Sequence, residues 1–298
     1  MGPFLEVLLG GLMAGVLYAL VALGFVLIFK ASGVFNFAQG AMVLFAALTL
    51  VRLMEVLPFV LAFAASCAIM VALAFAIERL VLRPLVNQEG LILFMATIGI
   101  TFFIDGFGQT LWGSDIYTLE LGLPKSPWII LDPPLPGGIL VSPVDVFAAV
   151  TAGALVAGLA VFFNRTKVGR ALRAVADDHQ AAQSVGIPLN TIWLIVWSVA
   201  GVVALVAGMA WGTKLGVQFS LALVALKAIP VIILGGLTSI PGAIVGGLII
   251  GAGEKLAEVY IGPAFGGGIE NWFAYVVALL FLLFRPQGLF GERIIERV

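Results

Sequence analysis

The chain of 298 residues is built from apolar runs about as long as a lipid bilayer is thick. A helix needs roughly 20 apolar residues to cross a hydrocarbon layer of about 30 Å. Nine candidate runs follow one another, at 5–29, 33–51, 57–81, 91–112, 144–163, 192–211, 221–237, 243–260 and 269–284. They leave no room for a soluble domain. We therefore predict an all-α, polytopic membrane protein in which residues 1–298 form a single domain.

The second and seventh runs are the weakest candidates, because each is short or interrupted by polar residues, glycine or proline. Either run can be broken or re-entrant, so the expected count is about nine spans, between eight and ten. Basic loops of membrane proteins concentrate on the cytoplasmic side. Placing the loop 164–190 there also places the C-terminus inside, and it leaves the acidic, proline-rich stretch at 115–132 and the N-terminus outside.

Composition excludes several classes of protein. Charged residues make up 10% of the chain and the net charge is −1, so the broad basic surface of a nucleic-acid-binding protein is missing. A single cysteine and a single histidine provide neither a metal cluster nor a nucleophile with its base. The chain also lacks a phosphate-binding loop motif. We expect no metal, cofactor or catalytic site, and any ATP hydrolysis must come from another chain.

Two polar interruptions, KASGVFNFAQG at 30–40 and KAIPVIILGGLTSIPG at 227–242, fall in corresponding places of the two halves. Interrupted segments at membrane depth are tolerated where protein or water satisfies them, and in transporters they point to the substrate path. For Asn36 and Gln39, hydrogen bonding between helices or an ordinary short loop explains the sequence equally well. Pro230 removes a helix donor and frees the carbonyl of Leu226. The pathway candidates are Asn36, Phe37, Gln39, Gly40, Pro230, Gly235 and Gly236.

Glycine pairs four residues apart occur at Gly11 and Gly15, at Gly242 and Gly246, and at Gly247 and Gly251. This spacing predicts close contact between helix backbones. Asp105 and Glu254 are acidic residues near membrane depth, which makes them candidates for proton transfer. Their places toward the ends of their segments favour an interfacial position, and Lys227 is expected to reach an interface in the same way.

The charged loop 164–190 also has the pattern of a helix. Apolar residues recur at helical spacing, Arg173 can pair with Asp177 one turn on, and a glycine followed by a proline ends the pattern. The apolar stripe consists of Val168, Leu172, Val175, Ala182 and Val185. We predict a short helix at the membrane face whose stripe contacts another protein. The alternative is a solvated loop whose only role is its charge.

Several blocks of the chain resemble a known family over nearly its whole length. They are LYALVALGFVLIFKASGVFNFAQG at 17–40, IERLVLRPL at 77–85, VGRALRAVADDHQAAQSVGI at 168–187, ILGGLTSIPGAIVGGLIIG at 233–251 and RPQGLFG at 285–291. The chain resembles the Liv-type permeases of ABC importers for branched-chain amino acids, which have relatives for urea and other small solutes. The resemblance implies an α-helical permease embedded in the lipid of the bacterial inner membrane. It also implies a second permease subunit, two cytoplasmic ATPase subunits that carry ATP and Mg, and a periplasmic or lipid-anchored binding protein.

By position, the loop looks like the cytoplasmic segment that docks on an ATPase subunit. The residues carried over are Gly169, Arg170, Arg173, Asp177, Asp178, Ala181, Ala182 and Gly186. The chain departs from the compact Glu-Ala-Ala pattern, because Asp178 is separated from the two alanines by His-Gln. The expected function is ATP-driven import by alternating access. The alternatives are a proton-coupled secondary transporter and a passive channel for a small polar solute such as urea.

Overall fold

The computed structural model describes residues 2–85, 88–124, 126–130, 138–177 and 179–291, so the predicted site residue Asp178 lies outside the described part. The longer helices are α1 (Gly2–Ser32), α2 (Gln39–Met54), α3 (Phe59–Ile77), α4 (Gly90–Trp112), α5 (Pro143–Arg165), α6 (Lys167–Asp177), α8 (Leu189–Leu215), α9 (Val224–Gly235), α10 (Ile240–Tyr260) and α12 (Phe273–Phe284). The short elements are α7 (His179–Ser184), α11 (Gly262–Phe265), a π-turn at Glu78–Leu82 and 3₁₀ turns at Arg83–Leu85, Phe219–Leu223 and Ile269–Asn271. Two short strands, β1 (Trp128–Ile130) and β2 (Ile139–Val141), pair antiparallel.

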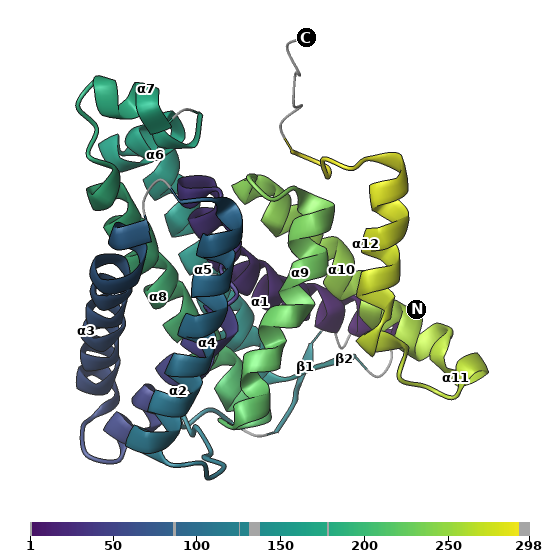
Figure 1. Cartoon of the computed structure of the whole chain (residues 1–298). Helices are drawn as coiled ribbons and strands as arrows, with labels where there is room; N and C mark the ends of the chain where they lie inside the picture. The colour runs from purple at the N-terminus through teal and green to yellow at the C-terminus, as the bar shows by residue number, and fades with distance from the viewer. Residues whose placement is uncertain (1, 86–87, 125, 131–137, 178, 292–298) are drawn as a thin grey trace.

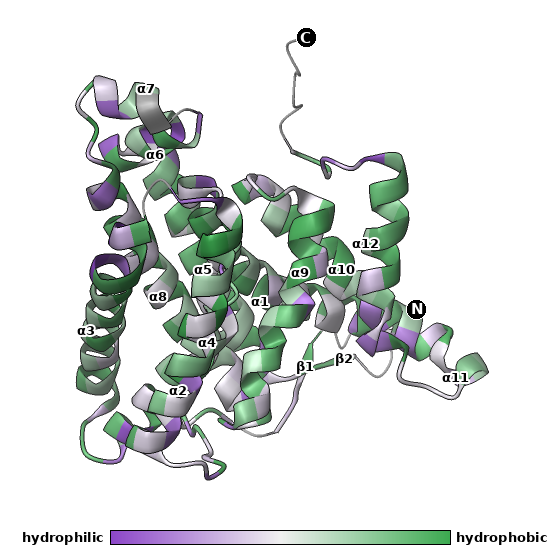
Figure 2. Ribbon diagram, in the orientation of Figure 1, coloured by the Kyte–Doolittle hydropathy of each residue, from purple (hydrophilic) through white to green (hydrophobic). Residues whose placement is uncertain are grey.

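The prediction of an all-α membrane protein is confirmed. Each of the nine apolar runs contains a helix within the described residues. Six helices are long and apolar enough to cross a bilayer, and three shorter apolar helices, Gln39–Met54, Phe219–Gly235 and Phe273–Phe284, accompany them. In the loop 164–190 the described residues on both sides of position 178 are helical, in α6 and α7, as the helical pattern predicts. Apolar residues cover the helix bodies in Figure 2, as expected for elements that face either lipid or one another.

Helix α1 lies at the centre of the bundle and contacts α5, α8, α9 and α10. Its residues from Leu17 to Ile28 are all buried, and so are most residues of α2 and α8. Helices α3, α4 and α12 instead expose large apolar side chains along much of their length. The central helices therefore form the rigid core, and the outer helices present the surface that suits lipid or a membrane partner.

Glycines allow α1 and α10 to approach closely. A Cβ atom on Gly15 would overlap the backbone at Gly247, and one on Gly251 would overlap the backbone of Gly15. The opposite side of α10 uses Gly242 and Gly246 to meet the backbone of α9. The prediction of close packing from the glycine spacing is therefore confirmed, and α10 uses one pair against each neighbour.

The two ends of the bundle differ. In Figure 1 the charged helices α6 and α7 lie on the upper side, where α12 also ends. The connection between α2 and α3 and the strands β1 and β2 lie on the lower side. If α6 and α7 face the cytoplasm, the lower side is the outer face, and we use the terms inner and outer in that sense below.

Candidate functional site

The first broken segment re-enters the bundle from its inner end. After α1 ends at Ser32, Gly33 turns the chain with a φ angle of 69°. Helix α2 then begins at Gln39, whose side chain lies against Gly24 of α1, where a Cβ atom would collide with it. Gly24 is eight residues before Ser32, so the chain has moved back about 12 Å along α1 before α2 starts. This segment is a half-helix that begins inside the bundle.

Asn36 organises the start of α2. Its Oδ1 atom accepts a hydrogen bond from the backbone N–H of Ala38 at 3.1 Å, and its Nδ2 atom donates to Oε1 of Gln39 at 3.5 Å. The backbone N–H of Phe37 donates to Oγ1 of Thr97 on α4 at 3.3 Å. Asn36 and Gln39 are both fully buried, and the side chain of Asn36 satisfies a backbone group of the interruption, whereas Nε2 of Gln39 has no partner among the described residues. Sequence reasoning missed Thr97, because no local pattern connects residues 60 apart in the chain.

The second broken segment re-enters from the outer end. Helix α8 ends at Leu215, and Val217 then pairs with Tyr117 through hydrogen bonds of 3.0 and 2.8 Å. The 3₁₀ turn at Phe219–Leu223 precedes α9. The predicted break at 227–242 is therefore partly wrong, because the chain is interrupted before α9 and again after Gly235, while Pro230 stays inside the helix. The carbonyl of Leu226, which Pro230 leaves free, accepts a hydrogen bond from the hydroxyl of Tyr275 at 2.9 Å.

The two half-helices start against each other. A Cβ atom on Gly40 would overlap the carbonyl of Ala222 and would lie 3.0 Å from Cβ of Ala225. We call this contact, formed by Gly40, Ala222 and Ala225, the helix crossing. It brings together the amino-terminal ends of α2 and α9, which the chain approaches from opposite ends of the bundle. Broken segments that meet in this way are typical of substrate paths in transporters.

The remaining pathway candidates lie elsewhere. Gly235 accepts a hydrogen bond from the backbone N–H of Phe290 at 3.1 Å, and Leu234 accepts one from Leu289 at 2.8 Å. Gly236 has a φ angle of 106° and contacts Gly288 and Gly291. Gly235 and Gly236 therefore close the inner end of α9 against the segment that follows α12, and they do not contribute to the helix crossing.

A polar trio lies beside the crossing. Nζ of Lys227 is 2.8 Å from Oε1 of Glu254, and the hydroxyl of Tyr18 donates to the same oxygen at 3.1 Å. Glu254 is 1% exposed and pairs with Lys227 inside the bundle, so each charge is satisfied by the other, while their place near the membrane interface stays a prediction. A lone buried charge is costly, and pairing reduces that cost. Lys227 is the single charge in the apolar run 221–237, which signals that it needs a partner but does not say which one.

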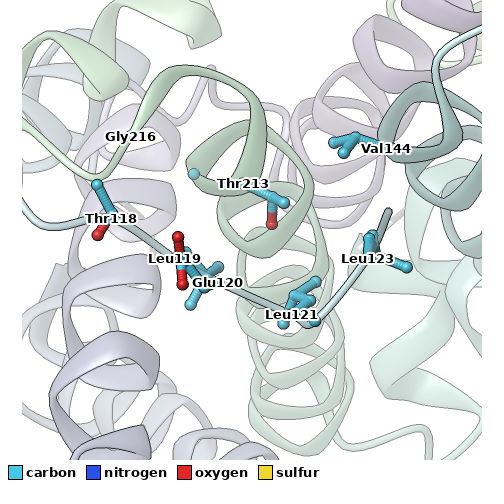
Figure 3. Close-up of a pocket in the computed structure, with 10 residues that line it drawn as sticks. Thr118, Leu119, Glu120, Leu121, Leu123, Val144, Thr213 and Gly216 are labelled. Atoms are coloured by element: carbon cyan, nitrogen blue, oxygen red, sulfur yellow. The ribbon is translucent and has the colours of Figure 1, made fainter. Parts of the chain in front are cut away.

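Two cavities open on the outer face. One of about 380 Å³ is lined by residues 118–123 together with Val144, Gly212, Thr213 and Gly216. Figure 3 shows the segment from Thr118 to Leu123 passing beside the helix that carries Thr213. A second cavity of about 400 Å³ shares Thr118, Leu119 and Glu120 with the first. Both hollows are lined by one extended segment and helix ends, so they form openings on the outer face.

The turn between α5 and α6 is tightly built at the inner face. The backbone N–H of Gly169 donates to Oγ1 of Thr166 at 3.2 Å, which caps the start of α6. A Cβ atom on Gly169 would overlap the carbonyl group of Phe163. That carbonyl also accepts a hydrogen bond of 2.8 Å from Nη1 of Arg173. The expected pair between Arg173 and Asp177 is not among the ion pairs of the described residues. Gly169 and Arg173 therefore fix α6 to the end of α5.

The apolar stripe of the loop faces mostly inward. Leu172, Val175 and Ala182 are buried against the chain's own helices, with Ala182 only 3% exposed. Val185 is 75% exposed at the end of this region. The interpretation of the whole stripe as a docking surface is therefore wrong for its buried members. Among the predicted coupling residues, Arg170, Asp177, Ala181 and Gly186 are exposed and accessible to another protein.

A cavity of about 140 Å³ separates α6 from the connection between α9 and α10. Its lining includes Lys30, Arg173, Ser239 and Pro241. Ser239 caps α10 by accepting a hydrogen bond from the backbone N–H of Gly242 at 3.0 Å. The inner end of the second broken segment thus lies next to α6, with a small space between them.

Comparison with known proteins identifies the family. A family model described as the permease component of branched-chain amino acid transport systems matches residues 7–285. The high-affinity branched-chain amino acid transport system permease protein BraD of Pseudomonas aeruginosa is 32% identical over 99% of this chain and 98% of its own length. The permease protein LivH of Salmonella typhimurium is 30% identical over 99% and 98%. A probable branched-chain amino acid transport permease protein LivH of Methanocaldococcus jannaschii is 30% identical over 96% and 92%. The chain therefore belongs to the family of permease components of branched-chain amino acid transport systems.

Proposed function

We propose that this chain is the transmembrane permease subunit of an ATP-driven importer for branched-chain or related amino acids in the inner membrane. It works by alternating access, with a second permease subunit, two cytoplasmic ATPase subunits and an external binding protein. ATP and Mg belong to the ATPase subunits. The chain supplies the path through the membrane, and the binding protein delivers the solute.

The observation that carries this proposal is the helix crossing. The half-helices α2 and α9 both begin inside the bundle, so backbone groups at their starting ends lie near the path. These starting ends are not anchored at either surface of the membrane. At the crossing, Gly40 lies directly against backbone and alanine atoms, without long side chains between the two segments. A small relative movement of α2 and α9 therefore opens one side and closes the other, as alternating access requires.

The inner face supports the role of the segment 164–190 in coupling to ATP hydrolysis. Helix α6 is fixed to α5 through Gly169 and Arg173, so a partner that pulls on α6 also moves α5. Helix α5 in turn contacts α1, the central helix. The cavity beside Ser239 gives α6 space to move relative to the inner end of α10. The exposed residues Arg170, Asp177, Ala181, Val185 and Gly186 form the proposed contact with an ATPase subunit.

The proposal is tested by reconstitution. The chain is purified with its partner subunits, inserted into liposomes and supplied with the binding protein and labelled leucine. We expect uptake only when ATP is present on the side of the ATPase subunits. Uptake by this chain alone that follows a proton gradient would establish the secondary transporter, and uptake that merely equilibrates would establish the channel. Either result would overturn the proposal.

A further inference from the structure

Two cations line one small cavity at the inner face. We call it the inner cavity; it is the space of about 140 Å³ between α6 and the connection of α9 to α10. Lys30 lines it from the last turn of α1, and Arg173 lines it from α6. Both residues are half-buried. The fold therefore brings two positive charges from distant parts of the chain to the walls of one partly desolvated space.

No carboxylate compensates these two charges in the part of the chain that the structure describes. The lining of the inner cavity contains neither aspartate nor glutamate there. Lys30 and Arg173 are also absent from the ion pairs of the described residues. By contrast, Lys214 and Lys227 each pair with a carboxylate at 2.8 Å. Because two like charges in a shared, poorly solvated space repel each other, the inner cavity favours an anion that neutralises them.

The backbone holds both cations in place and leaves most of their donors free. Nζ of Lys30 donates to the carbonyl of Thr238 at 3.3 Å, and Nη1 of Arg173 donates to the carbonyl of Phe163 at 2.8 Å. An ammonium group has three N–H donors and a guanidinium group has five. Among the described residues no other acceptor takes a donor of either head group. The remaining donors are therefore available to a ligand.

The size and chemistry of the inner cavity suit a phosphate group. Pockets that enclose a drug-sized ligand measure roughly 300–1,000 Å³, so about 140 Å³ fits one ionic group and not a whole metabolite. Thr238 and Ser239 add hydroxyl groups to the lining. A phosphate group presents at least three acceptor oxygens in different directions, so it can accept from donors on several walls at once, which a planar carboxylate cannot.

The position of the inner cavity points to a lipid as the source of this group. Lys30 lies at the inner end of α1, a helix long enough to span the membrane. Phe290, which is 50% exposed, lines the same cavity and offers an apolar surface beside the two cations. The exposed residues Arg165, Lys167 and Arg170 add positive charge around the start of α6, where hydrophilic residues gather in Figure 2. Basic pockets between helices on the cytoplasmic side are typical sites for anionic headgroups.

We propose that the inner cavity binds a phosphate group through Lys30 and Arg173, and that this group belongs to the headgroup of an anionic phospholipid of the inner leaflet. A phosphate held by both cations connects the end of α1 to α6. Because Lys30 also contacts Thr238, the bound group holds α6 beside the connection of α9 to α10. The site goes beyond the proposed function, since its occupancy is measured on the folded chain without transport.

Binding is measured as stabilisation of the full chain in a non-ionic detergent. Tryptophan fluorescence follows the unfolding midpoint while short-chain phosphatidylglycerol is added, with phosphatidylcholine of the same chain length as the comparison. We expect phosphatidylglycerol to raise the midpoint further, because a ligand that binds the folded state stabilises it. A parallel titration compares inorganic phosphate with chloride at equal ionic strength. A rise with inorganic phosphate alone would keep the phosphate site but overturn the lipid source, and no rise with either probe would overturn the proposal.

Charge variants locate the binding. Lys30→Gln keeps a donor for the carbonyl of Thr238 but removes the charge, so the Kd for phosphatidylglycerol should rise about ten-fold, as for loss of one charge-assisted hydrogen bond. Lys30→Arg keeps the cation and should bind nearly as the unchanged chain does. Lys167→Gln is the matched control, because it removes an exposed cation of the same face that does not line the cavity. Unchanged binding by Lys30→Gln, or equal weakening by Lys167→Gln, would overturn the proposal.

A second position decides the question if Lys30→Gln does not fold. Thr238→Glu leaves both cations in place and adds a carboxylate beside them, since the carbonyl of Thr238 already contacts Nζ of Lys30. This internal carboxylate should occupy the cations, so phosphatidylglycerol should no longer raise the midpoint. Thr238→Gln has the same size without the charge and should preserve the rise. If both variants respond equally strongly, the phosphate group does not bind in the inner cavity.

Discussion

At the scale of single residues, two backbone groups at the interruptions find their partner in a side chain from a distant element. Pro230 frees the carbonyl of Leu226, and Tyr275 donates to it from a position 49 residues further along. Thr97, 60 residues further along than Phe37, accepts a hydrogen bond from the backbone N–H of Phe37. The sequence identifies which carbonyl lacks a donor, because that follows from proline chemistry. It does not identify the donor, because that depends on which helices become neighbours.

The hydrogen bond to Leu226 leads to a prediction. Tyr275→Phe removes the hydroxyl and leaves that carbonyl without its partner, so the protein should lose about 1 kcal/mol of stability. Thermal unfolding of the detergent-solubilised protein, followed by tryptophan fluorescence, should show a lower midpoint. Tyr260→Phe is the control, because Tyr260 is 55% exposed and packs on the ring of Phe4. Equal midpoints for Tyr275→Phe and the unchanged protein would contradict the assigned role of Tyr275.

Asn36 leads to a second prediction at this scale. Its Oδ1 atom accepts a hydrogen bond from the backbone N–H of Ala38 in the turn just before α2, so Asn36→Ala should destabilise the protein by about 1 kcal/mol. Asn36→Ser keeps an oxygen acceptor that can form the same kind of turn and should preserve most of the stability. Unfolding midpoints of the two variants check the prediction. If the serine variant unfolds as early as the alanine variant, the side chain stabilises this segment by some means other than the bond to Ala38.

At the scale of elements, the glycine spacing correctly predicted close helix packing. The apolar stripe of the loop 164–190 did not reveal which surface covers it. The glycine spacing predicts close helix approach because only glycine leaves the backbone uncovered, and Gly15 against Gly247 confirms it. The stripe of the loop 164–190 predicts an amphipathic helix, but either the chain itself or a second protein can cover an apolar face. The structure shows that the chain itself covers Leu172 and Val175.

Because Ala182 is buried, it is a poor position at which to test coupling to the ATPase. A charged, bulky side chain at Ala182, which is 3% exposed, would disturb the packing of α7 as well as any partner contact. Val185 is 75% exposed in the same region and is the better choice. We expect Val185→Asp to abolish the stimulation of ATP hydrolysis by the loaded binding protein while the permease remains folded. Val56→Asp is the control, because Val56 is 82% exposed at the opposite end of the bundle.

The outcome is read from ATP hydrolysis by the reconstituted importer. If Val185→Asp keeps full stimulation, Val185 is not part of the contact with the ATPase. If Val56→Asp loses stimulation as well, the effect of the substitutions is not specific to the inner face. Size-exclusion chromatography of both variants confirms that loss of stimulation does not come from loss of the folded permease.

At the scale of the whole molecule, the nine apolar runs predicted the helices, while the depth at which they begin required the structure. The sequence marks a polar break at 30–40, but only the contact between Gln39 and Gly24 shows that α2 starts well inside the bundle. The second break is only partly predicted, because the chain leaves the α-helix at 216–223 as well as after Gly235, while Pro230 stays inside α9. The Lys227–Glu254 pair was missed because two charges 27 residues apart carry no shared local pattern.

The orientation of the whole bundle leads to the last prediction. Val56 and Val185 are separated by α3, α4 and α5, and all three are long and apolar enough to cross a membrane. An odd number of crossings places the two valines on opposite sides, and the basic residues of α6 place Val185 inside. In a Cys67→Ala background, the thiol from Val56→Cys should react with an impermeant maleimide in intact cells. The thiol from Val185→Cys should react only after the cells are opened. Reaction of both thiols from the same side would mean that one of the three helices does not cross, and a reversed pattern would invert the proposed direction of the importer.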